Sequence, residues 1–126
     1  MSNNKQMRIA SFLQTEYRDA RNAAHAGNTE EAWRHLERAH IVAQGLLLPH
    51  LYSHWRMLVL ATKTADVREI FGQLMRLALA PLGNLTGRLP IGNTGRSDVS
   101  AFVHMDIPED LRAILGAESQ QAQHKE

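Results

Sequence analysis

The sequence predicts an all-α fold, a small antiparallel bundle of four main helices arranged as stacked hairpins. Apolar residues recur at helical spacing through most of residues 4–80. The breaks between these stretches are short and contain Gly, Asn, Asp or Pro, and short connections make successive helices antiparallel neighbours. The chain has 126 residues, a length typical of one domain.

The first two expected helices form one hairpin. The first covers residues 4–26, because its apolar stripe contains no Gly or Pro to interrupt it. Gly27 ends this helix, and either Asn28 or Thr29 can cap the second one. The second helix then continues to about Gln44.

The other two main helices follow in the same way. Pro49 can begin a third helix, which continues to about Lys63. Asp66 caps or opens a fourth helix. We expect this helix to end near Ala80, because Pro81 and a nearby glycine stop it.

A long segment rich in Gly, Pro and Asn, residues 81–100, is expected to be a loop. Its length indicates a functional or mobile segment. Residues 87–94 have the glycine spacing of a phosphate-binding loop, but Asn93 replaces the lysine and no strand precedes it, so nucleotide binding is excluded. The sequence GNTG at residues 92–95 is expected to form tight turns with positive φ that pack on the bundle.

The chain ends in a short helix and a polar tail. Pro108 and Glu109 can begin a helix that continues to about Leu115, and the polar residues after it are expected to fray. The expected organisation is a single domain over residues 1–126, with the bundle in residues 4–80, the loop in 81–100, and the short helix and tail in 101–126.

Composition excludes several classes of function. With 14 Lys and Arg against 13 Asp and Glu, the charge gives no basis for binding nucleic acid or an anionic membrane. The absence of cysteine excludes disulfides, thiolate metal sites and cysteine nucleophiles. The chain has neither a secretory apolar segment near its start nor about 18 consecutive apolar residues. We therefore expect a cytoplasmic protein.

Ionisable residues lie where apolar stripes should continue. Glu16, His40 and His54 each fall on the apolar face of their helix. Burying such groups without a partner costs several kcal/mol, so they are usually paired or bound to a metal. Glu37 and His50 lie one helical turn from two of them, in the patterns Glu-x-x-His and His-x-x-x-His.

The register of the hairpins brings these residues to one level. Residues equidistant from a turn face each other in an antiparallel pair, so His40 is expected to face His54, with Glu16 in the same layer. Nitrogen and carboxylate ligands without sulfur suit a divalent transition metal, namely Fe, Zn, Cu, Ni or Mn. We therefore predict one centre, for one ion or a close pair, with the ligands Glu16, Glu37, His40, His50 and His54.

Other residues are expected to lie outside this centre. His35 falls on the solvent side of its helix. Glu69, Gln73 and Arg76 line a face of the fourth helix that is turned away from its apolar face, so they are expected to be solvated or, at most, to support the ligands. The aromatic residues expected in the core are Phe12, Trp33, Trp55 and Phe71.

Three classes of function stay open, the third being a hydrolase or oxygenase built on the same residues. The first is an intracellular metal-binding helical protein with a role in metal handling, sensing or redox chemistry; catalysis would require an open coordination position. The second is a helical protein-interaction module whose buried Glu–His network fixes core packing. The expected partners are a metal ion and a second copy or another protein, and the sequence contains no motif of a metal-free enzyme.

Five segments carry a family resemblance. They are residues 33–44 (WRHLERAHIVAQ), residues 50–57 (HLYSHWRM), Glu69 with Gly72 and Gln73, residues 92–95 (GNTG) and residues 107–111 (IPEDL). In these segments the chain resembles an uncharacterised bacterial family, number 3703 in the domain-of-unknown-function series, whose members are short helical proteins without an established activity. The resemblance implies that the family pattern includes Glu37, His40, Gln44, His50, His54, Glu69 and Gln73. Arg96 departs from this pattern, because a glycine usually follows GNTG.

A second resemblance is local. Residues 23–39 (AAHAGNTEEAWRHLERA) are similar to the hinge of a tetratricopeptide helical pair, with Gly27 at the turn and Ala32 and Ala39 at close-packing positions. No copy recurs about 34 residues later, and such modules need about three repeats. The likeness therefore bears on packing more than on peptide binding.

Overall fold

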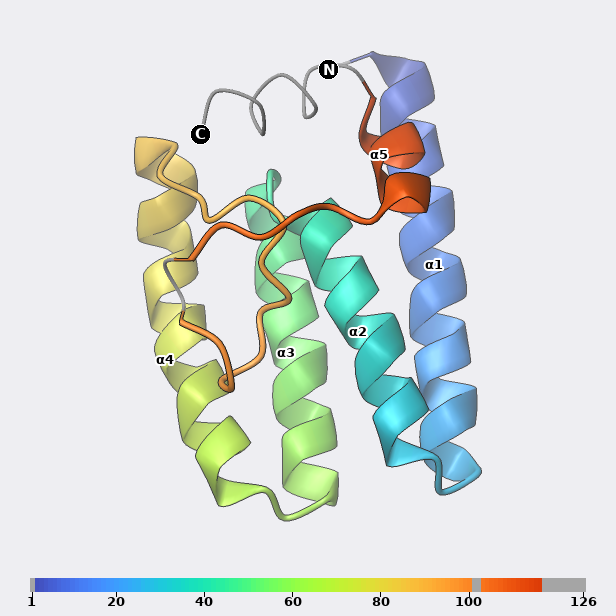
Figure 1. The fold of residues 1–126 in the computed structure, drawn as a ribbon, viewed down its shortest axis with the longest axis vertical. Coiled ribbons are helices and arrows are strands. Elements are labelled where there is room, and N and C mark those ends of the chain that lie inside the picture. Colours follow the sequence, from blue (N-terminus) through green and yellow to red (C-terminus); the bar gives the residue numbers. More distant parts are fainter. Residues whose placement is uncertain (1, 101–102, 117–126) are drawn as a thin grey trace.

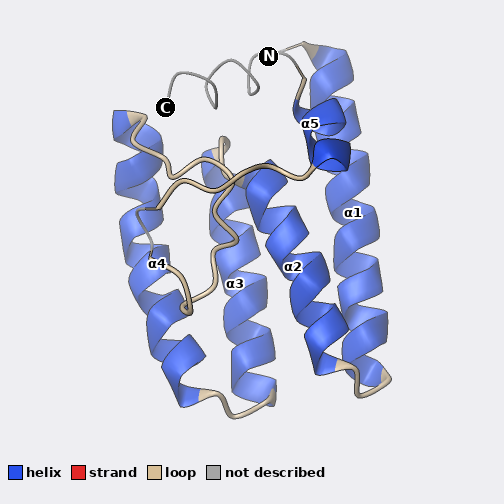
Figure 2. Ribbon diagram, in the orientation of Figure 1, coloured by secondary structure: helices blue, strands red, loops and turns tan. Residues whose placement is uncertain are grey.

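The computed structural model describes residues 2–100 and 103–116, and this part of the chain folds into five α-helices without strands (Figures 1 and 2). The helices are α1 (Asn3–His25), α2 (Thr29–Ala43), α3 (Leu47–Lys63), α4 (Val67–Thr86) and α5 (Glu109–Leu115). The four long helices lie side by side in chain order, and α5 packs on α1 and α2 (Figure 1). The predicted all-α bundle with a short last helix is confirmed.

Side-chain caps explain where three of the helices begin. Ser2, Asn28 and Asp66 precede α1, α2 and α4, and each side chain accepts a hydrogen bond from the backbone N–H three residues further on, at 3.2 Å. Such a bond satisfies one of the four N–H groups that a helix start leaves unpaired. Of the two caps that the sequence allowed for α2, the structure uses Asn28 rather than Thr29.

The helix α4 is longer than predicted. We expected it to end near Ala80, but it continues through Pro81 to Thr86 and ends at Gly87, whose φ of 72° is left-handed. A proline inside a helix removes one backbone hydrogen bond. The extra turns offset this loss, because they carry Asn84, whose amide bonds to groups on the neighbouring helices. The loop therefore begins at residue 87 rather than 81.

The main core lies between α1, α2 and α3. Alanines on these helices are almost completely buried, and their small side chains let the backbones approach closely. This core cluster consists of Tyr17, Ala20, Ala32, Trp33, Leu36, Ala39, Met57, Leu60 and Ala61. A second cluster fastens α5 to α1 and α2 and consists of Ile9, Ile41, Val42, Ile107, Leu111 and Leu115.

The orientation of α4 is opposite to the one predicted. Glu69 and Gln73 are only 3% and 0% exposed, whereas Phe71 is 69% exposed. Trp55 on α3 is also 52% exposed, so two of the expected core aromatics lie at the surface. The reason is the returning loop, which supplies hydrogen-bonding groups to the polar side of α4. The side chains that remain exposed form the α4 apolar face, which consists of Val67, Phe71, Leu74, Met75, Leu82 and Leu85.

The segment after α4 runs back across α4, α3 and α2 (Figure 1). As predicted, Gly92 and Gly95 have positive φ angles, of 78° and 84°. The Asn93 side chain between them is 1% exposed. Its amide donates to the carbonyl oxygens of Ser100 and Val103, and its Oδ1 accepts from the Gly95 N–H. These bonds stabilise the GNTG turn within the returning segment, and the carbonyl oxygens of Asn93 and Gly95 bond the turn to His40 on α2 and Gln73 on α4.

The end of the chain agrees with the expected short helix. Pro108 precedes α5, which covers Glu109–Leu115. The polar tail predicted after it lies outside the described residues. In the ranges that the structure describes, none of the helices combines the length and hydrophobicity that a membrane span requires.

Candidate metal centre

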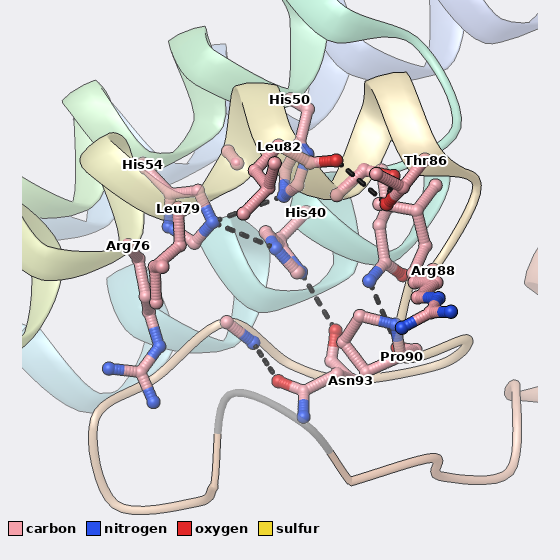
Figure 3. Close-up of a pocket in the computed structure, with 15 residues that line it drawn as sticks. His40, His50, His54, Arg76, Leu79, Leu82, Thr86, Arg88, Pro90 and Asn93 are labelled. Atoms are coloured by element: carbon pink, nitrogen blue, oxygen red, sulfur yellow. Dashed lines mark hydrogen bonds between the residues drawn. The ribbon is translucent and has the colours of Figure 1, made fainter.

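Three histidines meet inside the bundle. His40 comes from α2, His50 and His54 come from α3, and each is at most 4% exposed. The Nε2 atom of His54 lies 3.1 Å from that of His40 and 3.2 Å from that of His50 (Figure 3). We call this group the triad. The contact of His40 with His54 confirms the register that the hairpin predicted.

Each ring of the triad places its other nitrogen against a carbonyl oxygen. The Nδ1 atoms of His40, His50 and His54 lie 2.7, 2.8 and 2.8 Å from the backbone oxygen of Asn93, Oδ1 of Asn84 and Oε1 of Gln73, respectively. A carbonyl oxygen can only accept, so each Nδ1 must carry the proton and donate it. A neutral ring with a protonated Nδ1 has a lone pair at Nε2.

The orientations of the two side-chain amides are fixed by their other hydrogen bonds. The NH₂ group of Gln73 donates to Oε2 of Glu69 at 3.1 Å and to the carbonyl oxygen of Gly95 at 2.9 Å. The NH₂ group of Asn84 donates to the carbonyl oxygen of Gln44 at 3.1 Å. Both amides therefore turn their oxygen atoms, and not their nitrogens, toward the imidazoles.

Burial keeps the triad neutral at pH 7. It lowers the pKa of His54 to about 4, and it also lowers the pKa values of His40 and His50. Because each neutral ring carries its proton on Nδ1, none of the three Nε2 atoms is protonated, and their lone pairs face one another. Nitrogens bound tetrahedrally to one ion at about 2.0–2.1 Å lie about 3.3–3.4 Å apart. Two of the three Nε2 separations, 3.1 and 3.2 Å, are close to this spacing, and the ligand nitrogens of all three histidines lie within 4.8 Å of one another, so the triad could hold a metal ion.

The structure does not bring Glu16 to the triad. One of its carboxylate oxygens lies 2.5 Å from Nδ1 of His35, and the other accepts from Nε of Arg38 at 3.1 Å. Arg38 also bonds to Asp110 on α5 at 2.6 Å. The side chain of His35 is only 14% exposed, so the prediction that it lies in solvent was wrong. His35 and Arg38 both extend from α2 toward α1, where they bind the buried carboxylate of Glu16.

Glu37 also pairs with a cation rather than with the triad. Its Oε1 lies 3.4 Å from Arg96, and the pKa of Glu37 is raised because it is partly buried. Arg96 donates from Nε to Glu69 at 2.8 Å and lies 3.9 Å from the ring centre of Trp33. Of the five predicted ligands, the structure brings together the three histidines and leaves Glu16 and Glu37 in salt bridges.

The groups that orient the triad were only partly predicted from the sequence. Gln73 was expected to be solvated or, at most, to support the ligands, and it does support His54; Asn93 was considered only as part of a turn. A signal existed for both, since they lie in two of the segments that carry the family resemblance. Asn84 gave no comparable signal, because α4 was expected to end before it.

The triad forms one wall of a pocket of about 360 Å³ (Figure 3). The other walls come from α4 and the returning loop, and they are largely aliphatic. The side chains of Leu79, Leu82 and Leu89 contribute to these walls, together with Arg76 and Arg88. A metal ion on the triad would therefore have at least one coordination position on the side of this pocket.

Comparison with known protein families gives a match over most of the chain. A family described as Protein of unknown function (DUF3703) matches residues 7–115, which include the triad and the three residues that accept its Nδ1 protons. No curated protein and no solved structure matches the chain.

Proposed function

The chain belongs to the DUF3703 family, and we propose that it is a metal-binding protein whose triad holds one divalent transition-metal ion. The proposal rests on the convergence of three Nε2 atoms from rings whose Nδ1 atoms donate to carbonyl oxygens. In metal sites, a histidine ligand usually donates its second ring N–H to such an oxygen, which fixes the tautomer and the orientation of the ring.

The ligand set narrows the choice of metal. Imidazole nitrogens suit Zn, Cu, Ni and Fe, whereas Mn prefers carboxylate oxygens. Glu16 and Glu37, which would have supplied such oxygens, are held by His35, Arg38 and Arg96. The proposed ligands are therefore three of the five predicted from the sequence.

Three protein ligands beside an open pocket suit a metal centre with an exchangeable position. Structural zinc sites are usually closed by four protein ligands, whereas functional sites keep a position for water or another molecule. A zinc-bound water is more acidic than bulk water. The proposed centre could therefore bind a small ligand directly.

The alternative role of the histidines, a structural Glu–His network, accounts less well for the triad. A buried Glu–His pair does occur, but it joins Glu16 to His35. The hydrogen bonds of the triad go instead to amide and backbone oxygens. Without a cation, three lone pairs would face one another in a buried site, and protonating one ring there would bury an unpaired charge.

The test is a metal-binding titration of the full chain with Zn²⁺, followed by dialysis and elemental analysis. We expect one zinc per chain, and at a free zinc level one hundred times the dissociation constant the free energy of unfolding should rise by about 2.7 kcal/mol. His54→Ala and, separately, His50→Ala should lose the bound zinc. His25→Ala, at an exposed position, is the matched control and should keep it. Substoichiometric zinc in the unmutated chain, or equal loss in the control, would contradict the proposal.

A further inference from the structure

We infer that the pocket beside the triad binds a small aliphatic carboxylate, with its head group toward the metal position and its hydrocarbon part against the leucines of α4 and the loop. This inference rests on the proposed function, because the head group is assigned to the metal's open position. It adds the chemical class of the ligand. The size, the walls and the charge of the pocket support it in turn.

The pocket is larger than a metal-bound water requires. Its volume is about 360 Å³, whereas a water molecule takes up about 30 Å³ of the liquid. Pockets that bind small molecules usually have volumes between about 300 and 1,000 Å³. The pocket of this chain lies at the lower end of that range, which suits a compact ligand.

The walls of the pocket favour a hydrocarbon. Leu79 and Leu82 lie beside the histidines on one side (Figure 3), and Leu89 and Pro90 extend the aliphatic surface along the loop. Leu82 is 60% exposed and Leu79 is 36% exposed. An aliphatic chain that covers these side chains would remove apolar surface from water on both molecules, which is favourable.

The charge of the pocket favours an anion. Two arginines, Arg76 and Arg88, contribute to its walls, and among the residues that the structure describes no Asp or Glu lines it. Within the described part of the chain, the buried Nε atom of Arg76 has no hydrogen-bond partner. Figure 3 shows the guanidinium group of Arg76 turned away from the histidines, so it adds positive charge at the rim rather than a ligand at the centre. A metal ion on the triad would add further positive charge, and a carboxylate can both neutralise and ligate such an ion.

The test uses the full chain loaded with Co²⁺, whose visible absorption responds to a change of ligand. It is titrated with acetate, butanoate, hexanoate and octanoate, and with octan-1-ol as the uncharged analogue. We expect the dissociation constant to fall roughly twofold to fourfold for each methylene that is buried. Octan-1-ol should bind much more weakly than octanoate, because it lacks the charged head group.

A pair of variants on α4 locates the binding site. Leu82 lines the pocket, whereas Leu85, one turn further on, is 81% exposed and does not line it. Leu82→Ala should reduce the dependence of the carboxylate dissociation constant on the length of the hydrocarbon chain, without changing the affinity for Co²⁺. Leu85→Ala should leave both the carboxylate and the Co²⁺ dissociation constants unchanged.

The outcomes separate the two proposals. Failure to bind Co²⁺ would overturn both the metal site and the carboxylate site. Binding of Co²⁺ without any preference for octanoate over acetate would overturn only the carboxylate inference. Equal binding of octanoate and octan-1-ol, or identical effects of Leu82→Ala and Leu85→Ala, would also overturn it and leave the metal site intact.

Discussion

Gly95 lies directly against the imidazole of His40. A Cβ atom added at position 95 would lie 2.7 Å from two carbons of the ring, and the φ angle of +84° at this residue is one that side chains disfavour. The carbonyl oxygen of Gly95 also accepts a hydrogen bond from Gln73, which in turn orients His54. A single residue of the loop therefore contacts one histidine of the triad and supports another.

The substitution Gly95→Ala should impair both stability and metal binding. The left-handed backbone alone should lower the free energy of unfolding by about 1–3 kcal/mol, and displacement of His40 should weaken zinc binding at least tenfold. Urea denaturation and zinc titration measure the two effects. Gly45→Ala is the control, because a Cβ there would have no atom of the described residues within 4 Å. Equal zinc affinities in the two variants would show that the loop does not position the ring.

The substitution Gln73→Met tests the hydrogen bond that orients His54. In the unmutated chain, Oε1 of Gln73 lies 2.8 Å from Nδ1 of His54. Methionine keeps the length of the buried side chain but provides no oxygen to accept this hydrogen bond. Removing such a support typically lowers metal affinity about 10–100-fold. Competition titration with a zinc chelator measures the change, and Gln14→Met, at an exposed position, should leave the affinity unchanged. An unaltered affinity in Gln73→Met would contradict the role of this amide.

The substitution Glu16→Gln distinguishes the role predicted from the sequence, a metal ligand, from the role in the structure, a partner of His35 and Arg38. Its bonds to His35 and Arg38 predict a loss of about 1–3 kcal/mol in the free energy of unfolding, with one zinc per chain still bound. Glu37→Gln should also retain the zinc. Thermal unfolding and elemental analysis on the same samples measure both quantities. Loss of zinc in the Glu16 variant would restore this residue as a ligand.

The metal-free protein should lose stability as the pH falls from about 6.5 to about 4. In this range an unfolded histidine, with a pKa near 6.5, takes up a proton, whereas burial lowers the pKa of folded His54 to about 4. The unfolded chain therefore binds more protons, and stability decreases with falling pH. The lowered pKa values of His40 and His50 act in the same direction.

Urea denaturation of the metal-free protein at a series of pH values measures this slope. The variant His54→Leu should show a shallower decrease, because one of the three groups no longer titrates. If the free energy of unfolding decreased equally with pH in the variant and in the unmutated chain, the pH dependence would come from residues other than His54.

Much of the fold could be predicted because its signals are local. The apolar stripes and the caps at Asn28 and Asp66 depend only on neighbouring residues, and they located α1, α2, α3 and the start of α4 closely. The end of α4 could not be predicted in this way. Pro81 normally stops a helix, but contacts of Asn84 with residues about 35–40 positions earlier in the chain stabilise the additional turns.

The triad could be predicted because histidines interrupted two apolar stripes and a short turn fixed the register between them. The helix face on which a residue lies predicts the direction of its side chain but not the group that the side chain contacts. Glu16 does point into the protein, where it meets His35 and Arg38 instead of a metal position. The roles of Gln73 and Asn93 depend on how the loop folds back, and the loop has no periodic pattern from which this could be derived.

The most direct test of the metal centre is NMR on protein with nitrogen-labelled histidines and a spin-active cadmium isotope in place of the native ion. We predict one-bond coupling from a single cadmium ion to the Nε2 atoms of His40, His50 and His54, with their Nδ1 atoms protonated. Coupling through Nδ1, coupling to fewer than these three rings, or no coupling at all would contradict the proposed centre.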